Sequence, residues 1–264
     1  MPKLLVPARQ SADGVLHDVT PQSAGWTYVG FSTRKLAAGA SFALATEARE
    51  FCLVVLSGRV RVTAEGFDSG AIGERADVFS GLPWSVYLPP RTQARVSAEG
   101  EAEIALCSAP AEGRLKARVI APAQVETAER GKGTNLRHVR NILSETAEAE
   151  SLLVVEVITP SGHWSSYPPH KHDQDNFPIE TLLEETYYHR LKPPQGYGMQ
   201  RVYTDDRSLD ETMTVTDRDV VLVPKGYHPC AAAHGYDLYY LNVMAGPKRI
   251  WRFHNDPAHE WLMA

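Results

Sequence analysis

The sequence has no run of about 18–20 uninterrupted apolar residues, the length that a membrane-spanning helix requires. Its first ten residues, MPKLLVPARQ, lack the apolar core and the small-residue cleavage site of a signal peptide. Basic residues are not in excess, because 27 Lys and Arg stand against 32 Asp and Glu, a net charge of −5. A surface that binds nucleic acid is usually basic. We therefore expect a cytoplasmic protein that binds neither a membrane nor nucleic acid.

Cysteine is scarce as well. The three cysteines, Cys52, Cys107 and Cys230, are odd in number, scattered and never in CxxC spacing. This excludes a disulfide framework and a thiolate metal site, and it predicts reduced, buried thiols. The sequence also contains neither a GxGxxG motif nor a P-loop, so it suggests no organic cofactor.

Patterns typical of helices are few, and short runs of alternating apolar residues dominate the 264-residue chain. The 19 glycines and 18 prolines separate these runs, as closely spaced antiparallel strands require. Residues 109–135 are expected to form a connector with a possible short helix. The predicted strands fall into two sets on either side of it: 26–36, 41–46, 51–58, 59–65, 84–89, 94–99 and 102–108, then 151–160, 185–191, 197–204, 212–217, 219–224 and 237–244.

The two sets resemble each other, which predicts an internal duplication. When 219–233 is aligned with 84–98, Pro224 falls on Pro89 and His228 falls on Gln93. We predict an all-β fold of two antiparallel β-barrel or jelly-roll domains, with residues 1–125 in the first and 126–264 in the second. Since the first half lacks an HxH motif, we expect the second half alone to carry the chemistry.

The stretch PPHKHDQDNFPIETLLEETYYHR, residues 168–190, contains the HxH motif. In a strand, His170 and His172 would point the same way, with Cα atoms roughly 6.6 Å apart, and both imidazoles could reach one ion. Glu185 begins the next predicted strand, and His228 follows a Pro-Lys-Gly turn further on. Three imidazoles and one carboxylate suit Zn²⁺, Mn²⁺, Fe²⁺, Co²⁺ or Ni²⁺.

The stretches WSSYPPHKHD, LEETYYHR, VPKGYHP and DPAHEW resemble the cupin family of 5-deoxy-glucuronate isomerases, from myo-inositol catabolism. The related 5-keto-4-deoxyuronate isomerases have a similar HxH…E…H arrangement. The resemblance implies a duplicated cupin (bicupin) fold and one divalent metal ion, Zn, Mn or Fe. The implied ligands are His170, His172, Glu185 and His228. The usual cupin spacing places the glutamate closer to the second histidine, so Glu180 and Glu184 stay as alternatives to Glu185.

The reaction that this resemblance implies is an aldose–ketose isomerisation of 5-deoxy-D-glucuronate to 5-dehydro-2-deoxy-D-gluconate. It requires a proton to move between C1 and C2 through an enediol, or an equivalent hydride shift. The candidates for proton transfer are Tyr187, His189 and Asp173, and Asp256 and His259 in the C-terminal tail are expected to close over the site. A uronate carboxylate needs a cation, ideally a bidentate arginine, and the candidates are Lys171, Arg190 and Arg201. Relatives of this type also imply a homo-oligomer.

Other interpretations compete with each of these roles. His189 is alternatively a satisfied pocket histidine, Tyr187 a core aromatic residue, and the three cations solvated surface groups. The stretch RHVRNI, residues 137–142, is interpreted as structural or interfacial. The same ligand set also suits a cupin Fe(II) dioxygenase, whose pocket would be more apolar, or a non-catalytic sugar-binding bicupin, which would turn over no uronate.

Overall fold

A computed structural model describes residues 3–263, and almost all of its regular structure is antiparallel β-sheet. This confirms the predicted all-β fold. The three cysteines are free and buried. No helix among the described residues is long and apolar enough to cross a membrane.

The chain forms two compact units. The first, here called the N-terminal unit, contains residues 8–126 and 141–154. The second, the C-terminal unit, contains residues 3–7, 127–140 and 155–263. Each unit therefore takes a short segment from the other side of the boundary that the sequence suggested near residue 125. Strand pairing explains the exchange at the N-terminus, because β1 (Leu5–Val6) pairs with β20 (Val220–Val223) of the C-terminal unit.

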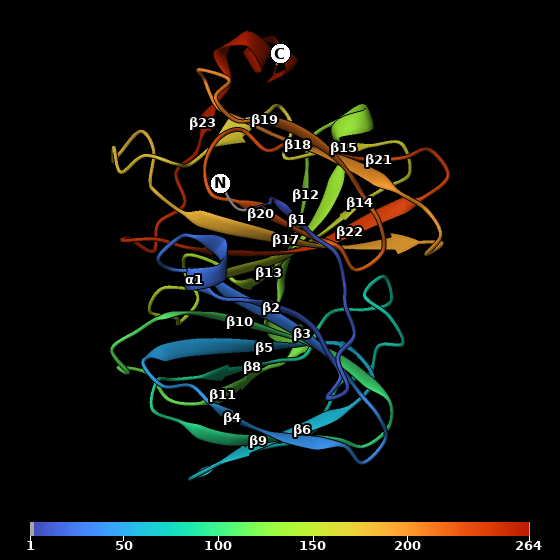
Figure 1. Ribbon diagram of the computed structural model, residues 1–264, viewed down its shortest axis with the longest axis vertical. Coiled ribbons are helices and arrows are strands. Elements are labelled where there is room, and N and C mark those ends of the chain that lie inside the picture. Colours follow the sequence, from blue (N-terminus) through green and yellow to red (C-terminus); the bar gives the residue numbers. More distant parts are fainter. Residues whose placement is uncertain (1–2, 264) are drawn as a thin grey trace. The chain divides into compact units, whose positions relative to one another are not determined.

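The N-terminal unit contains a six-stranded and a four-stranded sheet (Figure 1). The order of the larger sheet is β11-β8-β5-β10-β3-β2, and that of the smaller is β4-β9-β6-β7. A single α-helical turn, α1 (Pro21–Ala24), follows β2. The strand bounds are β2 (Val15–Val19), β3 (Gly30–Leu36), β4 (Ser41–Ala45), β5 (Arg49–Ser57), β6 (Val60–Ala64), β7 (Phe67–Ile72), β8 (Ser85–Leu88), β9 (Gln93–Ala98), β10 (Ala102–Pro110) and β11 (Arg118–Ile120).

The C-terminal unit contains a seven-stranded sheet, a four-stranded sheet and one short strand pair (Figure 1). The order of the largest sheet is β1-β20-β17-β22-β14-β13-β12, that of the smaller is β15-β21-β18-β19, and β16 pairs with β23. The further bounds are β12 (Glu126–Arg130), β13 (Arg137–Leu143), β14 (Leu153–Thr159), β15 (Trp164–Ser165), β16 (His170–Lys171), β17 (Glu184–Lys192), β18 (Gly198–Tyr203), β19 (Asp210–Val215), β21 (Cys230–Ala232), β22 (Asp237–Ala245) and β23 (His254–Asn255).

The strand orders establish the duplication that the sequence predicted. Order β8-β5-β10-β3-β2 in the first unit repeats as β20-β17-β22-β14-β13 in the second, and β4-β9-β6-β7 repeats as β15-β21-β18-β19. Alternating burial builds each core: in β9, Ala94, Val96 and Ala98 point inward and the residues between them are more exposed. Aliphatic side chains such as Leu53 and Ile104 fill the N-terminal core. The C-terminal core also contains Tyr187 and Tyr240.

Several stretches differ from the sequence-based expectation, since β2, β7 and β13 are strands that were not predicted. Two further differences have a visible cause. The expected strand at 26–36 begins only at Gly30, because the Trp26 indole donates a hydrogen bond to the Val29 carbonyl (2.7 Å) and holds the chain in a turn. The expected connector at 109–135 contains β11, β12 and two 3₁₀ turns, Pro122–Gln124 and Gly133–Asn135. Its polar composition hides these strands because β12 is exposed along its whole length.

Candidate metal centre and cavity

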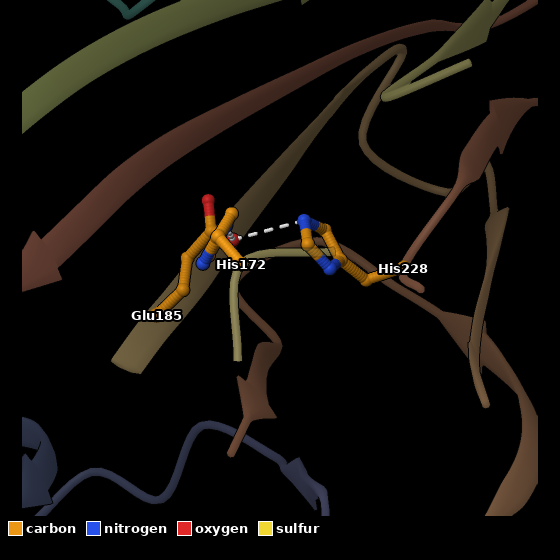
Figure 2. Close-up of side chains that lie close together, drawn as sticks. All are labelled: His172, Glu185 and His228. Atoms are coloured by element: carbon orange, nitrogen blue, oxygen red, sulfur yellow. Dashed lines mark hydrogen bonds and ion pairs between the residues drawn. The ribbon is translucent and has the colours of Figure 1, made fainter. Parts of the chain in front are cut away.

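Three of the four predicted metal ligands lie together inside the C-terminal unit. His172 follows β16, Glu185 lies on β17, and His228 precedes β21. Figure 2 shows the three side chains pointing toward one another. Their ligand atoms all lie within 4.8 Å of one another, and all three residues are buried. Residues 56 positions apart in the chain therefore meet at one point, as the sequence predicted for these three.

Each imidazole of this cluster is held by a backbone carbonyl. Nδ1 of His172 lies 3.0 Å from the Leu183 carbonyl oxygen, and Nδ1 of His228 lies 2.8 Å from that of Gly226. A carbonyl oxygen only accepts hydrogen bonds, so both Nδ1 atoms carry a proton. In the neutral imidazoles the Nε2 atoms then present lone pairs, which fixes the tautomer that metal-binding histidines usually have.

Both Nε2 atoms face the same carboxylate oxygen. Oε2 of Glu185 lies 3.0 Å from Nε2 of His172 and 3.0 Å from Nε2 of His228. Two lone pairs and an anionic oxygen repel one another unless a positive charge lies among them. A divalent cation or an imidazolium proton supplies that charge, so the donor set fits a metal such as Zn²⁺, Mn²⁺ or Fe²⁺.

Electrostatics favours an ionised carboxylate at this point. Burial alone would raise the pKa of Glu185, but His228 and His172 outweigh it and hold the pKa well below its usual range. Burial alone would lower the pKa of His172, but Glu185 has the larger effect, so the net pKa of His172 is raised. The site therefore stabilises one negative charge next to two nitrogen ligands.

His170, the fourth predicted ligand, lies beside this cluster. Its ring centroid is 5.0 Å from that of His228 and 4.7 Å from that of Phe253. Its ligand atoms are outside the group that lies within 4.8 Å. Burial, and next the charge of His228, lower the pKa of His170 well below its usual value, so its imidazole is neutral. A neutral imidazole is the form that binds a metal.

The alternatives to Glu185 have other partners or directions. Glu180 accepts hydrogen bonds from the backbone N–H groups of Asp173 and Gln174. Glu184 precedes Glu185 in β17, so its side chain points to the other face of the sheet. The geometry therefore brings Glu185, and neither alternative, to the two histidines.

A cavity of about 580 Å³ opens beside the cluster, within the C-terminal unit. His170 and Tyr187 line it, and their ring centroids lie 5.0 and 5.8 Å from that of His228. The volume is in the range of pockets that bind small molecules. Its lining is mixed. Aliphatic residues such as Val139, Val155 and Val157 lie beside polar and aromatic ones, which include Ser166, Tyr167, Tyr240, Asn242, Trp251, Asn255, Arg130, Lys132 and Arg137.

The comparisons with known proteins agree with this architecture. The KduI/IolB family model matches residues 4–262. The chain belongs to the KduI/IolB family. The 5-deoxy-glucuronate isomerase of Geobacillus kaustophilus HTA426 is 52% identical over 265 residues, which cover 100% of this chain and 96% of that protein. The 5-deoxy-glucuronate isomerase of Bacillus subtilis 168 is 49% identical over 251 residues, covering 94% and 93%.

Two solved structures resemble this chain along nearly its whole length. The crystal structure of an IolB-like protein from Salmonella typhimurium LT2 has a TM-score of 0.97 and 52% identity, and the match covers 99% of this chain and all of that one. Oxalate decarboxylase of Bacillus subtilis has a TM-score of 0.65 at 12% identity, covering 97% of this chain and 80% of that one. At that identity the likeness is one of fold, and it confirms the duplicated cupin fold for this member of the KduI/IolB family.

The N-terminal unit has different residues at the equivalent positions. Glu185 pairs with the last residue of β20, whereas Phe51 pairs with the last residue of β8, which is equivalent to β20. Gln93 begins β9, the equivalent of the strand β21 that follows His228. An apolar ring and an amide stand where the family member's C-terminal unit has a carboxylate and an imidazole, and neither is a usual metal ligand.

Of the three residues predicted to transfer protons, Tyr187 alone lines the cavity. His189 lies behind it, with its ring stacked on Tyr187 (centroids 5.9 Å apart) and its Nε2 donating to Gln200 (2.8 Å). Asp173 bonds to Lys171 and accepts from a backbone N–H, and it is not among the residues that line the cavity.

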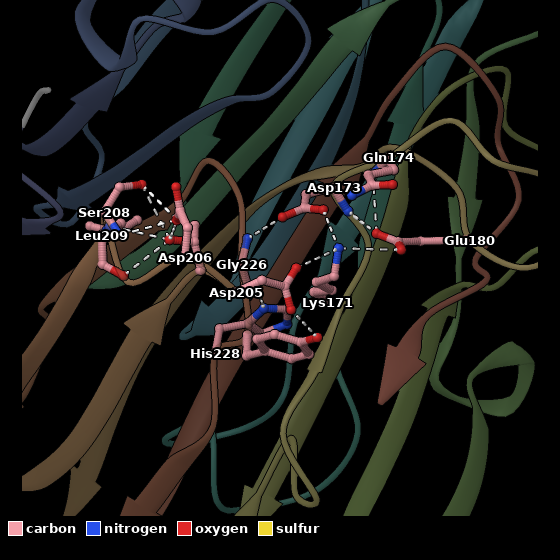
Figure 3. Close-up of polar contacts among 12 residues, drawn as sticks. Lys171, Asp173, Gln174, Glu180, Asp205, Asp206, Ser208, Leu209, Gly226 and His228 are labelled. Atoms are coloured by element: carbon pink, nitrogen blue, oxygen red, sulfur yellow. Dashed lines mark hydrogen bonds and ion pairs between the residues drawn. The ribbon is translucent and has the colours of Figure 1, made fainter. Parts of the chain in front are cut away.

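The three cations predicted to bind substrate also lie outside the cavity lining. Lys171 is buried, and Figure 3 shows its ammonium group among Asp173, Glu180 and Asp205, at 2.9, 3.6 and 3.5 Å. Burial alone would lower the pKa of Lys171, but these carboxylates have the larger effect, so its net pKa is raised. Lys171 lies between His170 and His172, and because successive side chains of an extended segment point to opposite sides, it points away from both histidines.

Arg190 and Arg201 are each held by one carboxylate. Nε of Arg190 donates to Asp217 (2.8 Å), and Arg201 binds Asp210 through two hydrogen bonds of 2.7 Å. Both pairs join neighbouring segments of the sheets and do not face the cavity.

The C-terminal tail does reach the cavity, through residues that the sequence did not single out. Leu262 and Met263, at the end of the 3₁₀ segment Pro257–Met263, contribute to the lining. Asp256 instead accepts a hydrogen bond from Tyr203 (2.7 Å), and His259 lies 3.9 Å from Asp256. These two residues anchor the tail.

The cavity's own cations are Arg130, Lys132 and Arg137. Arg137 opens the stretch RHVRNI, which had been interpreted as structural or interfacial. Alternation within that stretch carries a signal, because Arg137 and Val139 share one face of β13 and both line the cavity. Sequence alone does not show which face of β13 meets the cavity.

Proposed function

We propose that this chain is a metal-dependent aldose–ketose isomerase that converts 5-deoxy-D-glucuronate to 5-dehydro-2-deoxy-D-gluconate. Membership of the KduI/IolB family and relatives at about 50% identity that are named 5-deoxy-glucuronate isomerase support the reaction. The observation that carries the proposal is the pair of Nε2 atoms, 3.0 Å from one oxygen of Glu185, beside a cavity of about 580 Å³.

The ligands in this proposal are His172, Glu185 and His228, with His170 as the fourth from the cavity side. A divalent cation held there supplies Lewis-acid polarisation of the substrate's carbonyl and hydroxyl oxygens. The protein supplies the fixed tautomers, through the Leu183 and Gly226 carbonyls, so the nitrogen lone pairs are aligned before binding.

Tyr187 is the proposed acid–base group, because it lines the cavity and lies on β17 two residues after Glu185. Burial, and next the charge of Glu185, raise its pKa well above the usual value. Its hydroxyl therefore keeps its proton at neutral pH and can deliver it to a substrate oxygen. Ser166, 2.8 Å away, is placed to exchange that proton with the tyrosine hydroxyl.

The walls of the cavity fit a sugar acid better than the apolar chelating substrate expected for a dioxygenase. Ser166, Tyr240 and Asn242 line it and carry hydroxyl and amide groups that suit sugar hydroxyls, and Arg130 and Arg137 suit a carboxylate. These polar and cationic side chains, which lie among apolar ones such as Val155 and Phe253, support the isomerase over the dioxygenase alternative.

The direct test incubates metal-loaded protein with 5-deoxy-glucuronate and follows ketose formation by NMR. We expect turnover that is lost with a chelator and restored by a divalent ion. His172→Ala is expected to lose bound metal and activity together, since it removes one of the nitrogen donors. Gln93→Ala, at the equivalent end of the N-terminal unit, is the matched control and should keep both. Absence of turnover with every metal tried would reject the proposed reaction.

A further inference from the structure

The cavity carries positive charge with no acidic side chain to balance it. Its described lining residues include Arg130, Lys132 and Arg137 but neither Asp nor Glu. Elsewhere in the C-terminal unit cations such as Lys171, Arg190 and Arg201 have carboxylate partners. A concave, partly enclosed site with unbalanced cations attracts an anion.

Arg137 differs from the other cations of its own strand. On β13, His138 lies 3.4 Å from a carboxylate oxygen of Glu129, and Arg140 lies 3.5 Å from one of Glu156. Within the described part of the chain, Arg137 bonds only to backbone carbonyls, at 3.2 Å to Asn135 and 3.4 Å to Tyr167. It is therefore the cation of β13 that no protein carboxylate neutralises.

The geometry of these bonds leaves one side of the guanidinium for a ligand. Both bonds start from Nη1, so the edge formed by Nε and Nη2 is not used by them. That edge has the two parallel N–H groups that match the two oxygens of a carboxylate. Arg137 is only partly buried and lines the cavity, so this edge can meet a ligand there.

The same bonds fix Arg137 relative to the metal centre. The Tyr167 carbonyl that it holds is in the segment that leads to His170, and Ser166, Tyr167 and His170 all line the cavity. Arg137 thus lines the same cavity as His170.

Arg130 adds a second cation to this wall. Its guanidinium lies 5.4 Å from the ring centroid of Trp251, which also lines the cavity. Arg130 and Arg137 are both positively charged and line the same cavity. The two guanidinium groups therefore repel each other, and an anion bound at Arg137 relieves that repulsion.

We infer that Arg137 is the residue that recognises the carboxylate of a sugar acid in this cavity, with Arg130 strengthening the local positive potential. The inference rests on the proposed function for the identity of the sugar acid. It assigns to Arg137 the role that sequence patterns suggested for Lys171, Arg190 and Arg201. The carboxylate end of the substrate lies at β13, and its carbonyl end lies toward His170.

The test compares two substrates in metal-loaded protein: 5-deoxy-glucuronate, and the neutral 5-deoxy-hexose in which a hydroxymethyl group replaces the carboxylate. The variants are Arg137→Met, which removes the charge, and Arg137→Lys, which keeps the charge but loses the two parallel N–H groups of the guanidinium. Arg201→Met is the matched control, because that arginine lies outside the cavity. Metal content and thermal unfolding are measured for each variant.

A charge-assisted pair predicts that Arg137→Met lowers the ratio of kcat/KM for the uronate to kcat/KM for the neutral sugar roughly 10- to 100-fold. The change should appear mainly in KM, with a smaller loss for Arg137→Lys and none for Arg201→Met. An equal loss for both sugars would overturn the inference and make Arg137 a positioning residue for the 166–170 segment. An unchanged ratio would overturn it as well.

Direct binding separates this inference from the proposed reaction. D-Glucuronate and D-glucose are titrated calorimetrically into wild type and Arg137→Met. Preference for the acid in wild type, lost in the variant, supports Arg137 even if wild type does not isomerise 5-deoxy-glucuronate, in which case the proposed reaction alone fails. Turnover by wild type without any preference for the acid in binding or kinetics leaves the reaction standing and rejects the role of Arg137. If wild type shows neither turnover nor a preference for the acid in binding, the proposed reaction and the role of Arg137 are both rejected.

Discussion

The hydroxyl groups of Tyr187 and Ser166 lie 2.8 Å apart, at the wall of the cavity beside the histidine–glutamate cluster. Tyr187 comes from β17, in the centre of the largest sheet, and Ser166 follows β15 of the smaller sheet. Ser166 has a positive φ of 50°, which is uncommon for a residue other than glycine. The pairing places a protonated hydroxyl at the point where a substrate oxygen would approach the centre.

Tyr187→Phe removes this hydroxyl and keeps the ring. We expect kcat to fall by roughly 10²- to 10⁴-fold, the range for loss of an acid–base group, while bound metal and KM change little. Tyr239→Phe is the control, because the Tyr239 hydroxyl bonds to Glu156 and does not line the cavity. Steady-state kinetics and metal analysis check this, and a fall in metal content parallel to kcat would show a structural role instead.

His189 is expected to act on stability and not on the reaction. Its side chain is fully buried, and burial lowers its pKa from 6.5 to about 4. In the unfolded chain this histidine binds a proton below about pH 6.5, while in the folded protein it does so only below about 4. Its neutral form therefore stabilises the fold above pH 6.5, and that contribution is lost as the pH falls toward 4.

For His189→Gln, the difference in free energy of unfolding from wild type should shrink by up to about 3 kcal/mol between pH 7 and pH 4. Urea unfolding of both proteins in chelator, where metal loss does not contribute, measures this difference. A constant difference across the pH range contradicts the assigned pKa. A kcat lowered more than tenfold at pH 7 would instead restore the catalytic role predicted from the sequence.

Lys171 is expected to stabilise the loop between the HxH motif and β17. Lys171→Met leaves Asp173 and Glu180 without their buried cation, and we expect a loss of roughly 3 kcal/mol in the free energy of unfolding. Lys248→Met removes an exposed pair with Asp175 and should cost less than about 1 kcal/mol. Denaturant titration checks both. A large rise in KM for the uronate without loss of stability would favour a substrate-binding role.

Gly226 is expected to control the orientation of His228. Its φ is 90°, and a Cβ there would lie 2.4 Å from the Tyr203 carbonyl oxygen. Gly226→Ala must therefore shift the turn whose carbonyl holds Nδ1 of His228, and we expect metal affinity to fall about 10- to 100-fold. Competition with a chromogenic chelator measures the affinity.

Gly235→Ala is the matched control for that turn. Gly235 has a nearly equal φ of 92°, but no atom lies within 4 Å of an added Cβ. The Gly235→Ala variant therefore carries the same backbone strain as Gly226→Ala, roughly 1–2 kcal/mol, without the clash. Equal metal affinity in the two alanine variants would show that strain, and not the position of His228, governs the effect.

Much of the architecture could be predicted because alternation of apolar residues reports directly on strands that bury one face. The duplication follows from such local patterns. The group of His172, Glu185 and His228 was implied by the resemblance of the short motifs to a known family, because spacing alone left Glu180 and Glu184 open. Exposed or two-residue strands gave no such pattern, so β12 and β16 were missed.

The sequence by itself determined the all-β class, the repeat and the residue types at the candidate metal centre, because these depend on local periodicity and on short motifs. Only the tertiary structure decided which charged groups face the cavity. Lys171, Arg190 and Arg201 are near the motifs in sequence, yet carboxylates from other segments neutralise them. Arg137 is distant in sequence, and the pairing of β13 in the largest sheet brings it to the cavity wall. Charge balance depends on neighbours in space, and the order of residues along the chain does not specify those neighbours.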